Sequence, residues 1–349
     1  MNYNWTLKDA VFTKDKGKVF SCFACGGGST MGYKLAGFDV IGCNEIDPKM
    51  MKAYVENHNP KYSFLEGIQT FKQRVDLPEE LFNLDILDGS PPCSSFSMSG
   101  NRESDWGKEK KFREGQAEQV LDTLFFDFID LAERLQPKVV IAENVKGLLL
   151  GEAKNYVIKI YEAFDKAGFV VQHFLLDASK MGVPQRRERV FFIALRKDLC
   201  EPFMEQVDFF TRLPKLTLEF NEREITYGEI KKDIGRRASD LYYSRWQKRI
   251  ESDNNFGDIT ERINGTDSCF SDVFAKLDKT LPTITAQGKI YDFDEGHFIS
   301  DNSFIKGGSF PLDYNFNDNK VFYLIGMSVP PLMTAKIAEQ VYSQWINKL

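Results

Sequence analysis

The stretch that decides the class of fold runs Lys18-Val-Phe-Ser-Cys-Phe-Ala-Cys-Gly-Gly-Gly28. Its first half is apolar and contains Val and Phe, which is typical of a buried β-strand. The run ends in three consecutive glycines, and a helix is expected to follow over residues 30–36. Glycines at such a junction let the backbone approach a ligand closely, and the first amides of the helix can bind it. The stretch therefore predicts a strand, a ligand-binding turn and a helix, which is the opening unit of an α/β sheet.

The alternation of strand and helix continues to about residue 195. Apolar runs predict the strands, and several of the segments between them have helical periodicity. Such an alternation indicates a parallel, doubly wound α/β sheet, in which ligands bind beyond the carboxyl ends of the strands. The predicted strands span residues 38–44, 84–87, 138–142, 173–176 and 189–195, and the predicted helices span 48–57, 116–135 and 156–167.

Composition limits the class of protein further. The 349 residues carry a formal net charge of −6, and 42% of them are hydrophobic. These values are ordinary for a globular protein and argue against a collagen-like or largely disordered one. Because the net charge is negative, any surface for nucleic acid must be a local basic patch. Sparse cysteines, no signal sequence and no apolar run of about 18 residues predict a cytoplasmic protein without a membrane segment.

The pattern changes near residue 200. Periodicity weakens there, and Gly, Asn, Asp and aromatic residues form irregular clusters up to about residue 282. An amphipathic helix is expected again over residues 334–346, after Pro330-Pro331. We therefore expect a large α/β domain over 1–198, a smaller irregular domain over 199–320 and a C-terminal segment over 321–349 that packs back on the first domain.

Glu45 is the first candidate for a binding residue outside the glycine turn. It ends the second predicted strand, in Asn44-Glu45-Ile46-Asp47. An acid at this position is the usual partner for the ribose hydroxyls of a nucleoside cofactor. The alternative is a tight turn with a helix cap, so the glycine turn and Glu45 are by themselves a weak signal.

A cysteine follows the strand predicted at 84–87, in Ser90-Pro-Pro-Cys-Ser94. Two prolines hold Cys93 on a rigid turn, which suits an exposed thiolate nucleophile better than a core residue. The alternative is that Cys93 is a small apolar filler, as many cysteines outside disulfides are. Taken alone, Cys93 favours the filler interpretation.

Two further sets of candidate residues lie beside later predicted strands. Glu143 ends the apolar strand predicted at 138–142, where a partly solvated carboxyl group could donate or share a proton. In Gln185-Arg-Arg-Glu-Arg189, alternation along a strand would send Arg187 and Arg189 to one face, as a clamp for a phosphate, a base or Glu143. The alternatives are a helix-cap or ion-pair acid and a solvated charge run.

These motifs occur in one order on successive predicted strand ends, and in this combination the sequence resembles the DNA cytosine-C5 methyltransferase family. The resemblance covers the chain from the first predicted strand to Leu195 and again near the C-terminus. It implies a Rossmann-like sheet that binds S-adenosyl-L-methionine, with a target-recognition domain over 199–320. The residues implied to bind the cofactor are Phe23, Ala24, Gly26, Gly27, Gly28, Glu45, Ile46, Pro92, Ser328 and Val329.

The resemblance also implies the chemistry. Cys93 would be the nucleophile that attacks C6 of cytosine, and Glu143 would be the acid that engages the base. Arg187 and Arg189 would support the substrate and the active-site carboxylate. The target atoms are inaccessible in a stacked duplex, so the base would have to be flipped out. A loop over 97–115 would close over the DNA, with contacts from Ser97, Arg102, Lys108 and Arg113.

The C-terminal part carries the remaining similarity. Residues 281–286 and 325–330 look like the last two motifs of the family, and the target-recognition region would lie before them. Its stretch 231–249 is basic and contains interleaved aromatic residues, which suits contact with phosphates and bases. A plain solvated helix is the alternative for this stretch. The residues expected to bind DNA there are Arg236, Arg237 and Arg245.

The implied partner is double-stranded DNA, and the implied state is a monomer, with or without a cognate restriction endonuclease. Two departures from the family pattern stand out: Cys25 replaces the first glycine of the turn, and Met327 replaces an asparagine. They motivate one alternative, a related protein that binds DNA but is catalytically impaired. A tRNA cytosine-C5 methyltransferase of the same fold is the other alternative.

No metal site is expected. Cys22-x-x-Cys25 could suggest zinc or redox chemistry, but no second pair of ligands lies at the spacing of a zinc finger. Both cysteines also fall on the strand and turn assigned to the cofactor.

Overall fold

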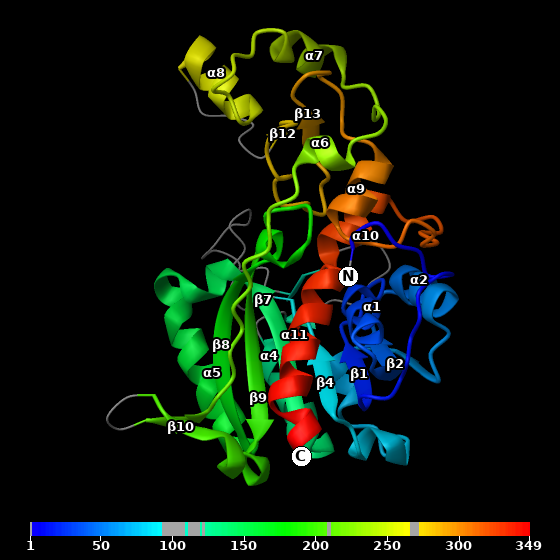
Figure 1. Ribbon diagram of the computed structural model, residues 1–349, viewed down its shortest axis with the longest axis vertical. Coiled ribbons are helices and arrows are strands. Elements are labelled where there is room, and N and C mark those ends of the chain that lie inside the picture. Colours follow the sequence, from blue (N-terminus) through cyan, green and yellow to red (C-terminus); the bar gives the residue numbers. More distant parts are fainter. Residues whose placement is uncertain (1, 93–108, 111–118, 121–122, 208–210, 266–271) are drawn as a thin grey trace. The chain divides into compact units, whose positions relative to one another are not determined.

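The computed structural model describes residues 2–92, 109–110, 119–120, 123–207, 211–265 and 272–349 (Figure 1). The chain forms two compact units, each discontinuous in the sequence. The sheet unit comprises Val11–Leu176, Glu188–Glu219 and Thr334–Leu349, and the mixed unit comprises Met1–Ala10, Asp177–Arg187 and Phe220–Met333. The domains expected from the sequence are instead continuous segments with boundaries at 198 and 320, and their functional assignment stays a prediction.

The sheet unit is built on seven strands in the order β3-β2-β1-β4-β7-β9-β8, most of which are seen side by side in Figure 1. β1 pairs in parallel with β2 and β4, β2 pairs in parallel with β3, and β4 with β7. The α/β class is therefore confirmed. The strands are β1 (Lys18–Cys22), β2 (Asp39–Glu45), β3 (Tyr62–Leu65), β4 (Ile86–Gly89), β7 (Val139–Val145), β8 (Phe169–Asp177) and β9 (Glu188–Arg196).

Helices connect the strands and cover the sheet. α2 shows how the sequence sets their limits, because Asp47 caps its first turn by accepting the N–H of Lys49 at 2.8 Å, and Pro48 follows as its first residue. α4 buries an aromatic face that includes Phe125 and Phe128 in the main core. The helices are α1 (Gly28–Leu35), α2 (Pro48–His58), α3 (Ile68–Phe71), α4 (Leu124–Leu135), α5 (Lys154–Lys166) and α11 (Pro331–Gln344).

Three expectations from the sequence were wrong in detail. β9 runs antiparallel to β7, because the link between β8 and β9 holds only a 3₁₀ turn and no crossover helix. The helix expected from residue 116 begins at Leu124, after a short strand, β6 (Gln119–Val120), that pairs with β5 (Glu109–Lys110). The edge strand β3 was not predicted, since it is short and alternates between half-buried and exposed positions.

The mixed unit has little regular structure, as the irregular sequence predicts. Aromatic residues form its core, among them Trp246, Phe256 and Tyr291. A two-stranded parallel sheet, β12 with β13, lies among short helices. Its elements are α6 (Tyr227–Ile230), α7 (Asp240–Trp246), α8 (Phe256–Asn264), β12 (Val273–Ala275), β13 (Ile290–Asp292), α9 (Asp301–Gly307) and α10 (Val321–Met327); a hairpin of β10 (Met204–Gln206) and β11 (Arg212–Pro214) belongs to the sheet unit.

One helical stretch, Val321–Lys348, is long and apolar enough to cross a membrane by length and composition alone. However, 67% of its most apolar window is buried inside the protein. Its C-terminal part packs within the sheet unit, where Tyr342 meets Phe38 edge-on with ring centroids 5.9 Å apart. This burial is that of a core helix.

Candidate active site

The turn after β1 is held in a compact, left-handed conformation. Phe23, Cys25 and Gly27 have φ angles of 53°, 48° and 82°, in the region that glycine adopts most easily. The amide of Ala24 donates to the carbonyl of Asn44 at 3.2 Å, which ties the turn to the end of β2. The left-handed backbone explains why a glycine is expected at the position of Cys25. A residue with a side chain costs about 1–2 kcal/mol at this φ.

Glu45 lies at the carboxyl end of β2 and points back at this turn. Its carboxylate accepts the amides of Cys25 at 2.7 Å and of Ile46 and Asp47 at 2.8 Å each. Burial raises the pKa of Glu45, whereas the hydrogen bonds from Asp47 and Cys25 lower it. The acid is therefore fixed beside the glycine turn, as the sequence predicts for a residue that binds a ribose.

A buried histidine contacts the glycine turn, and sequence reasoning missed this contact. His58 is buried at the end of α2, and its Nε2 lies 3.2 Å from the carbonyl of Gly26. Burial and the charge of Lys34 lower the pKa of His58 to about 3, so the imidazole is neutral and donates to that carbonyl. A lone histidine at the end of a helix carries no signal in the sequence that would have revealed this contact.

Gly27→Ala is expected to lower the free energy of unfolding by about 2–3 kcal/mol. The backbone at this position is left-handed, which strains any residue that carries a Cβ. That Cβ would also overlap the His58 imidazole, so the costs of backbone strain and of overpacking add. Urea unfolding of the single variant and of Gly27→Ala/His58→Ala checks this result. In the double variant the Gly27→Ala change should cost less stability, because the overlap with the imidazole is gone. If the losses of the two changes simply add, Gly27 and His58 are not in contact.

The most informative contact lies between β7 and β9. Nε of Arg189 is 2.9 Å from a carboxylate oxygen of Glu143, and the two side chains are only 15% and 12% exposed. Val145 is paired with Arg189 across the ladder, so Glu143 and Arg189 are diagonal neighbours on one face. Burial lowers the pKa of Arg189, and the nearby Glu143 carboxylate raises it.

The antiparallel direction of β9 is what makes this pair possible. β9 begins at the carboxyl end of β7, so its first residues meet Glu143. In the parallel arrangement expected from the sequence, Arg189 would lie at the opposite end of the strand. The correction to the fold therefore supports the predicted contact between Arg189 and Glu143.

The next residue of β7 ties this pair to the proline turn. Nδ2 of the buried Asn144 donates to the carbonyl of Pro91 at 3.1 Å. Pro91 is buried and Pro92 is half-buried. Cys93 lies outside the described residues, as do Ser97, Arg102, Lys108 and Arg113. The described chain nevertheless brings Pro91, two residues before Cys93, to the end of the strand that carries Glu143.

A buried acid on β4 is a second residue that sequence reasoning missed. Asp88 is 4% exposed and accepts hydrogen bonds from Ser21 at 2.7 Å and Tyr33 at 3.0 Å. Burial raises the pKa of Asp88 to about 7 against these two bonds, and the charge of Glu143 raises it further. The available signal was a carboxylate inside an otherwise apolar strand.

Arg187 has surroundings different from those of Arg189. It belongs to the mixed unit, is 3% exposed, and donates to the backbone carbonyls of Ile284, Gly326 and Ser328 at 3.0–3.1 Å. It thus joins the segments at 281–286 and 325–330, the two C-terminal motifs. Ser328 and Val329 are buried in the same unit, and their contact with a cofactor stays a prediction.

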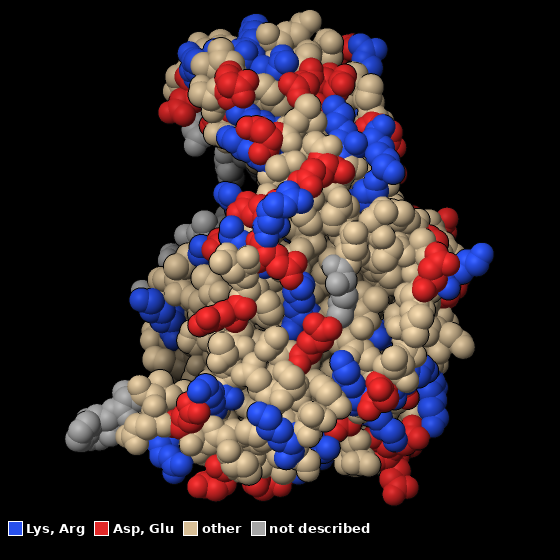
Figure 2. Space-filling model, viewed as in Figure 1, with Lys and Arg blue, Asp and Glu red and all other residues tan. Residues whose placement is uncertain are grey.

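The three arginines expected to bind DNA also lie in the mixed unit. Arg236 is exposed and its guanidinium lies 4.5 Å from the ring centre of Phe298. Arg237 pairs with Asp240 at 2.9 Å, and the guanidinium of Arg245 is 5.8 Å from the ring centre of Tyr242. On the face shown in Figure 2, basic and acidic side chains are interspersed. Among the described residues, no group of three or more His, Cys, Asp or Glu could hold a metal ion.

Comparison with known proteins agrees with the family resemblance found in the sequence. A family model described as C-5 cytosine-specific DNA methylase matches residues 17–343. The type II methyltransferase M.NgoPII of Neisseria gonorrhoeae is 35% identical over 52% of this chain and 49% of its own length. M1.HphI of Haemophilus parahaemolyticus, also a type II methyltransferase, is 26% identical over 93% of this chain and 87% of its own length.

Solved structures match the fold over almost the whole chain. A DNA modification methyltransferase encoded in an Escherichia coli prophage has a TM-score of 0.63 at 20% identity, over 93% of this chain and 98% of its own. Spodoptera frugiperda DNMT2 has a TM-score of 0.61 at 19% identity, over 92% and 99%. At these identities the likeness establishes the fold alone, and several of the sequence relatives, including M.NgoPII, are matched over about half of their length or less.

Proposed function

The chain belongs to the C-5 cytosine-specific DNA methylase family, and we propose that it methylates carbon 5 of cytosine in double-stranded DNA at a short specific sequence. One observation carries the proposal. The buried pair of Glu143 and Arg189 lies at the end of β7, and Asn144 of the same strand binds Pro91, two residues before Cys93. A carboxyl group and a thiol are the two groups that this reaction needs, and Cys93 follows Pro91 by two residues in the sequence.

S-adenosylmethionine would be the methyl donor, and the turn after β1 fits it. Gly26 to Gly28 leave the turn without side chains, and Glu45 is anchored by three amides at its edge. Glu45 would hold the ribose, Phe23 would stack near the adenine, and Pro92 would close the methionine end. When bound, the cofactor supplies the methyl group of a sulfonium.

The chemistry follows from the poor nucleophilicity of cytosine C5. The Cys93 thiolate forms a bond to C6, while Glu143 gives a proton to N3 as electrons shift toward the ring nitrogen. The ring then resembles an enamine, and C5 takes the methyl group. Loss of the C5 proton to a base forms the C5–C6 double bond again as the bond from sulfur to C6 breaks and releases the thiolate. N3 then returns its proton to Glu143.

Arg189 holds the Glu143 carboxyl group in place for that proton transfer. Its guanidinium is itself buried, so the orientation of the acid is fixed before the base arrives. The flipped base costs a few kcal/mol of stacking energy, which binding must supply. In this proposal the mixed unit recognises the target sequence, and the protein acts as a cytoplasmic monomer, with or without a cognate endonuclease.

Methyl incorporation tests the proposal directly. The full chain is incubated with radiolabelled S-adenosylmethionine and either duplex DNA or bulk tRNA. We expect label in DNA, recovered as 5-methylcytosine after digestion. Label in tRNA alone would identify the RNA-modifying alternative. A protein that binds no S-adenosylmethionine in a titration would be the catalytically impaired relative, and the proposal would fail.

A further inference from the structure

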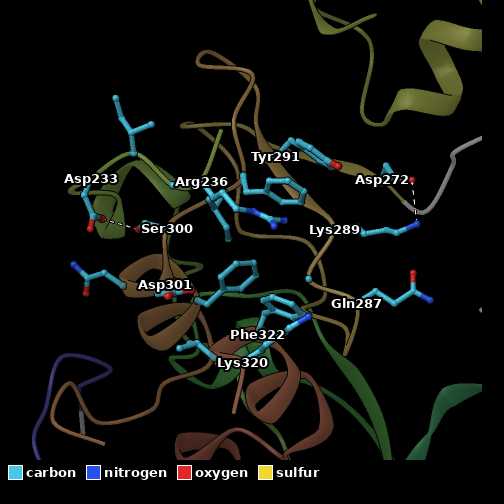
Figure 3. A pocket seen from close by; sticks show the side chains of 18 of the residues that line it. Asp233, Arg236, Asp272, Gln287, Lys289, Tyr291, Ser300, Asp301, Lys320 and Phe322 are labelled. Atoms are coloured by element: carbon cyan, nitrogen blue, oxygen red, sulfur yellow. Dashed lines mark hydrogen bonds and ion pairs between the residues drawn. The ribbon is translucent and has the colours of Figure 1, made fainter. Parts of the chain in front are cut away.

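The mixed unit contains a cavity of about 860 Å³ with aromatic walls and polar groups at its edge (Figure 3). Tyr291 and Phe322 lie on opposite sides of it, and the guanidinium of Arg236 lies between them in this view. Gln287 and Lys289, from the segment before β13, also line the cavity, and in this view the side chain of Lys289 extends toward Asp272. Concave sites of this size on which several polar groups converge are typical ligand sites.

Arg236 is held in position by a column of rings. Tyr242 stacks on Tyr291 with ring centres 5.5 Å apart, Tyr291 contacts Phe298 at 4.3 Å, and the Arg236 guanidinium lies 4.5 Å from Phe298. Arginine stacks well on aromatic faces because its charged group is planar and weakly hydrated. The contact with Phe298 restrains the position of the guanidinium, and its N–H donors can still bind another partner.

The backbone also places Arg236. The amide of Phe298 donates to the carbonyl of Arg236 at 3.0 Å. Gly235 permits this approach, because a Cβ there would overlap the carbonyl of Phe298. Arg236 is therefore set against the wall of the cavity by both its backbone and its side chain.

The neighbouring cations have partners that Arg236 lacks among the residues that the structure describes. Arg237 pairs with Asp240 at 2.9 Å, and Lys289 lies 3.5 Å from Asp272. Across the described ranges, Arg236 makes no ion pair and no side-chain hydrogen bond with another residue. Asp233, an acid of the same cavity, accepts the hydroxyl of Ser300 at 2.6 Å. An oriented guanidinium with unused donors is ready to bind a planar pair of acceptors.

We propose that Arg236 determines sequence specificity by reading a guanine of the target site. Guanine presents O6 and N7 together in the major groove, and arginine binds this pair with two parallel hydrogen bonds. The inference rests on the proposed function, because it names the base that the recognition unit reads. It also separates Arg236 from Arg237, which the basic sequence pattern places in one class.

The test compares Arg236→Ala with its neighbour, Arg237→Ala, as a matched control. Each full-length variant and the wild type are expressed in bacterial cells, and methylated cytosines are mapped by bisulfite sequencing. Wild-type methylation defines the target. For Arg236→Ala we expect methylation to spread to sites that differ at one G·C pair. Arg237→Ala should keep the wild-type target, and any affinity that it loses should be lost equally on all duplexes, as for a contact that does not read a base.

Binding of purified protein to duplexes supplies the second measurement. Affinities are compared for the wild-type target and for a duplex substituted at that G·C pair, or at each G·C pair in turn if Arg236→Ala methylates nothing. The discrimination should fall on the order of 10- to 100-fold in Arg236→Ala at one pair and remain in Arg237→Ala. An unchanged target with unchanged discrimination, or relaxation at an A·T pair, would overturn the assignment. A wild type that methylates nothing would instead refute the proposed function.

Discussion

Cys93→Ala is expected to abolish methyl transfer, with a loss on the order of 10⁴-fold or more, while S-adenosylmethionine still binds. Without the thiolate there is no bond to C6, and C5 is then too poor a nucleophile to take the methyl group. Most of the cofactor residues belong to the turn after β1 and the end of β2, and the contacts between these two segments do not involve Cys93. Methyl incorporation and a calorimetric titration with the cofactor measure the two effects separately.

Cys200→Ser provides the matched control. Cys200 is 5% exposed, and burial raises its pKa to about 11, so it does not supply a thiolate at neutral pH. Its variant should keep wild-type turnover. Retained turnover in Cys93→Ala would contradict the assignment of the nucleophile, whereas loss in both variants would point to general damage from cysteine replacement.

Arg189→Ala is expected to lower the free energy of unfolding by about 3–5 kcal/mol and to remove most of the activity. The change leaves the Glu143 carboxylate buried without its counter-charge, and breaking one side of a buried ion pair has costs of this size. It also releases the acid that must face N3 of the base. Urea unfolding and single-turnover methyl transfer measure the stability and the chemistry.

Two further variants separate these effects. Glu143→Gln/Arg189→Met removes both charges and should recover much of the lost stability without recovering activity, since the acid is absent. Arg189→Lys keeps a charge but not the planar group, so it should fall between the wild type and Arg189→Ala. A double variant as unstable as Arg189→Ala would show that the pair does not account for the loss.

The order of strands and helices in the sheet unit could be predicted because each apolar run and each glycine turn is a local signal. The direction of β9 could not, since it depends on the length of the link that follows β8 and not on the strand itself. Which segments of the chain make up each of the two units could not be predicted either. Residues 1–10 and 177–187 belong with residues 220–333, and such contacts between distant segments leave no local pattern.

Some residues of the candidate site could also be predicted from the sequence, and others could not. Glu45, Glu143 and Arg189 follow strand ends or precede them, so their positions were predictable from the alternation of elements. His58 and Asp88 are buried, and no spacing in the sequence reveals their contacts. Arg187 and Arg189 are two residues apart and look equivalent, yet one binds backbone carbonyls and the other binds Glu143.

Covalent trapping tests the central claim most directly. A substrate duplex that contains 5-fluorocytosine at the methylated position carries a fluorine that cannot leave C5 as a proton does, so the bond between sulfur and C6 persists. The full chain, the duplex and S-adenosylmethionine should give a stable adduct, and peptide mass spectrometry should locate it on Cys93. A protein that methylates the normal duplex but forms no adduct, or forms it through another residue, would contradict the mechanism.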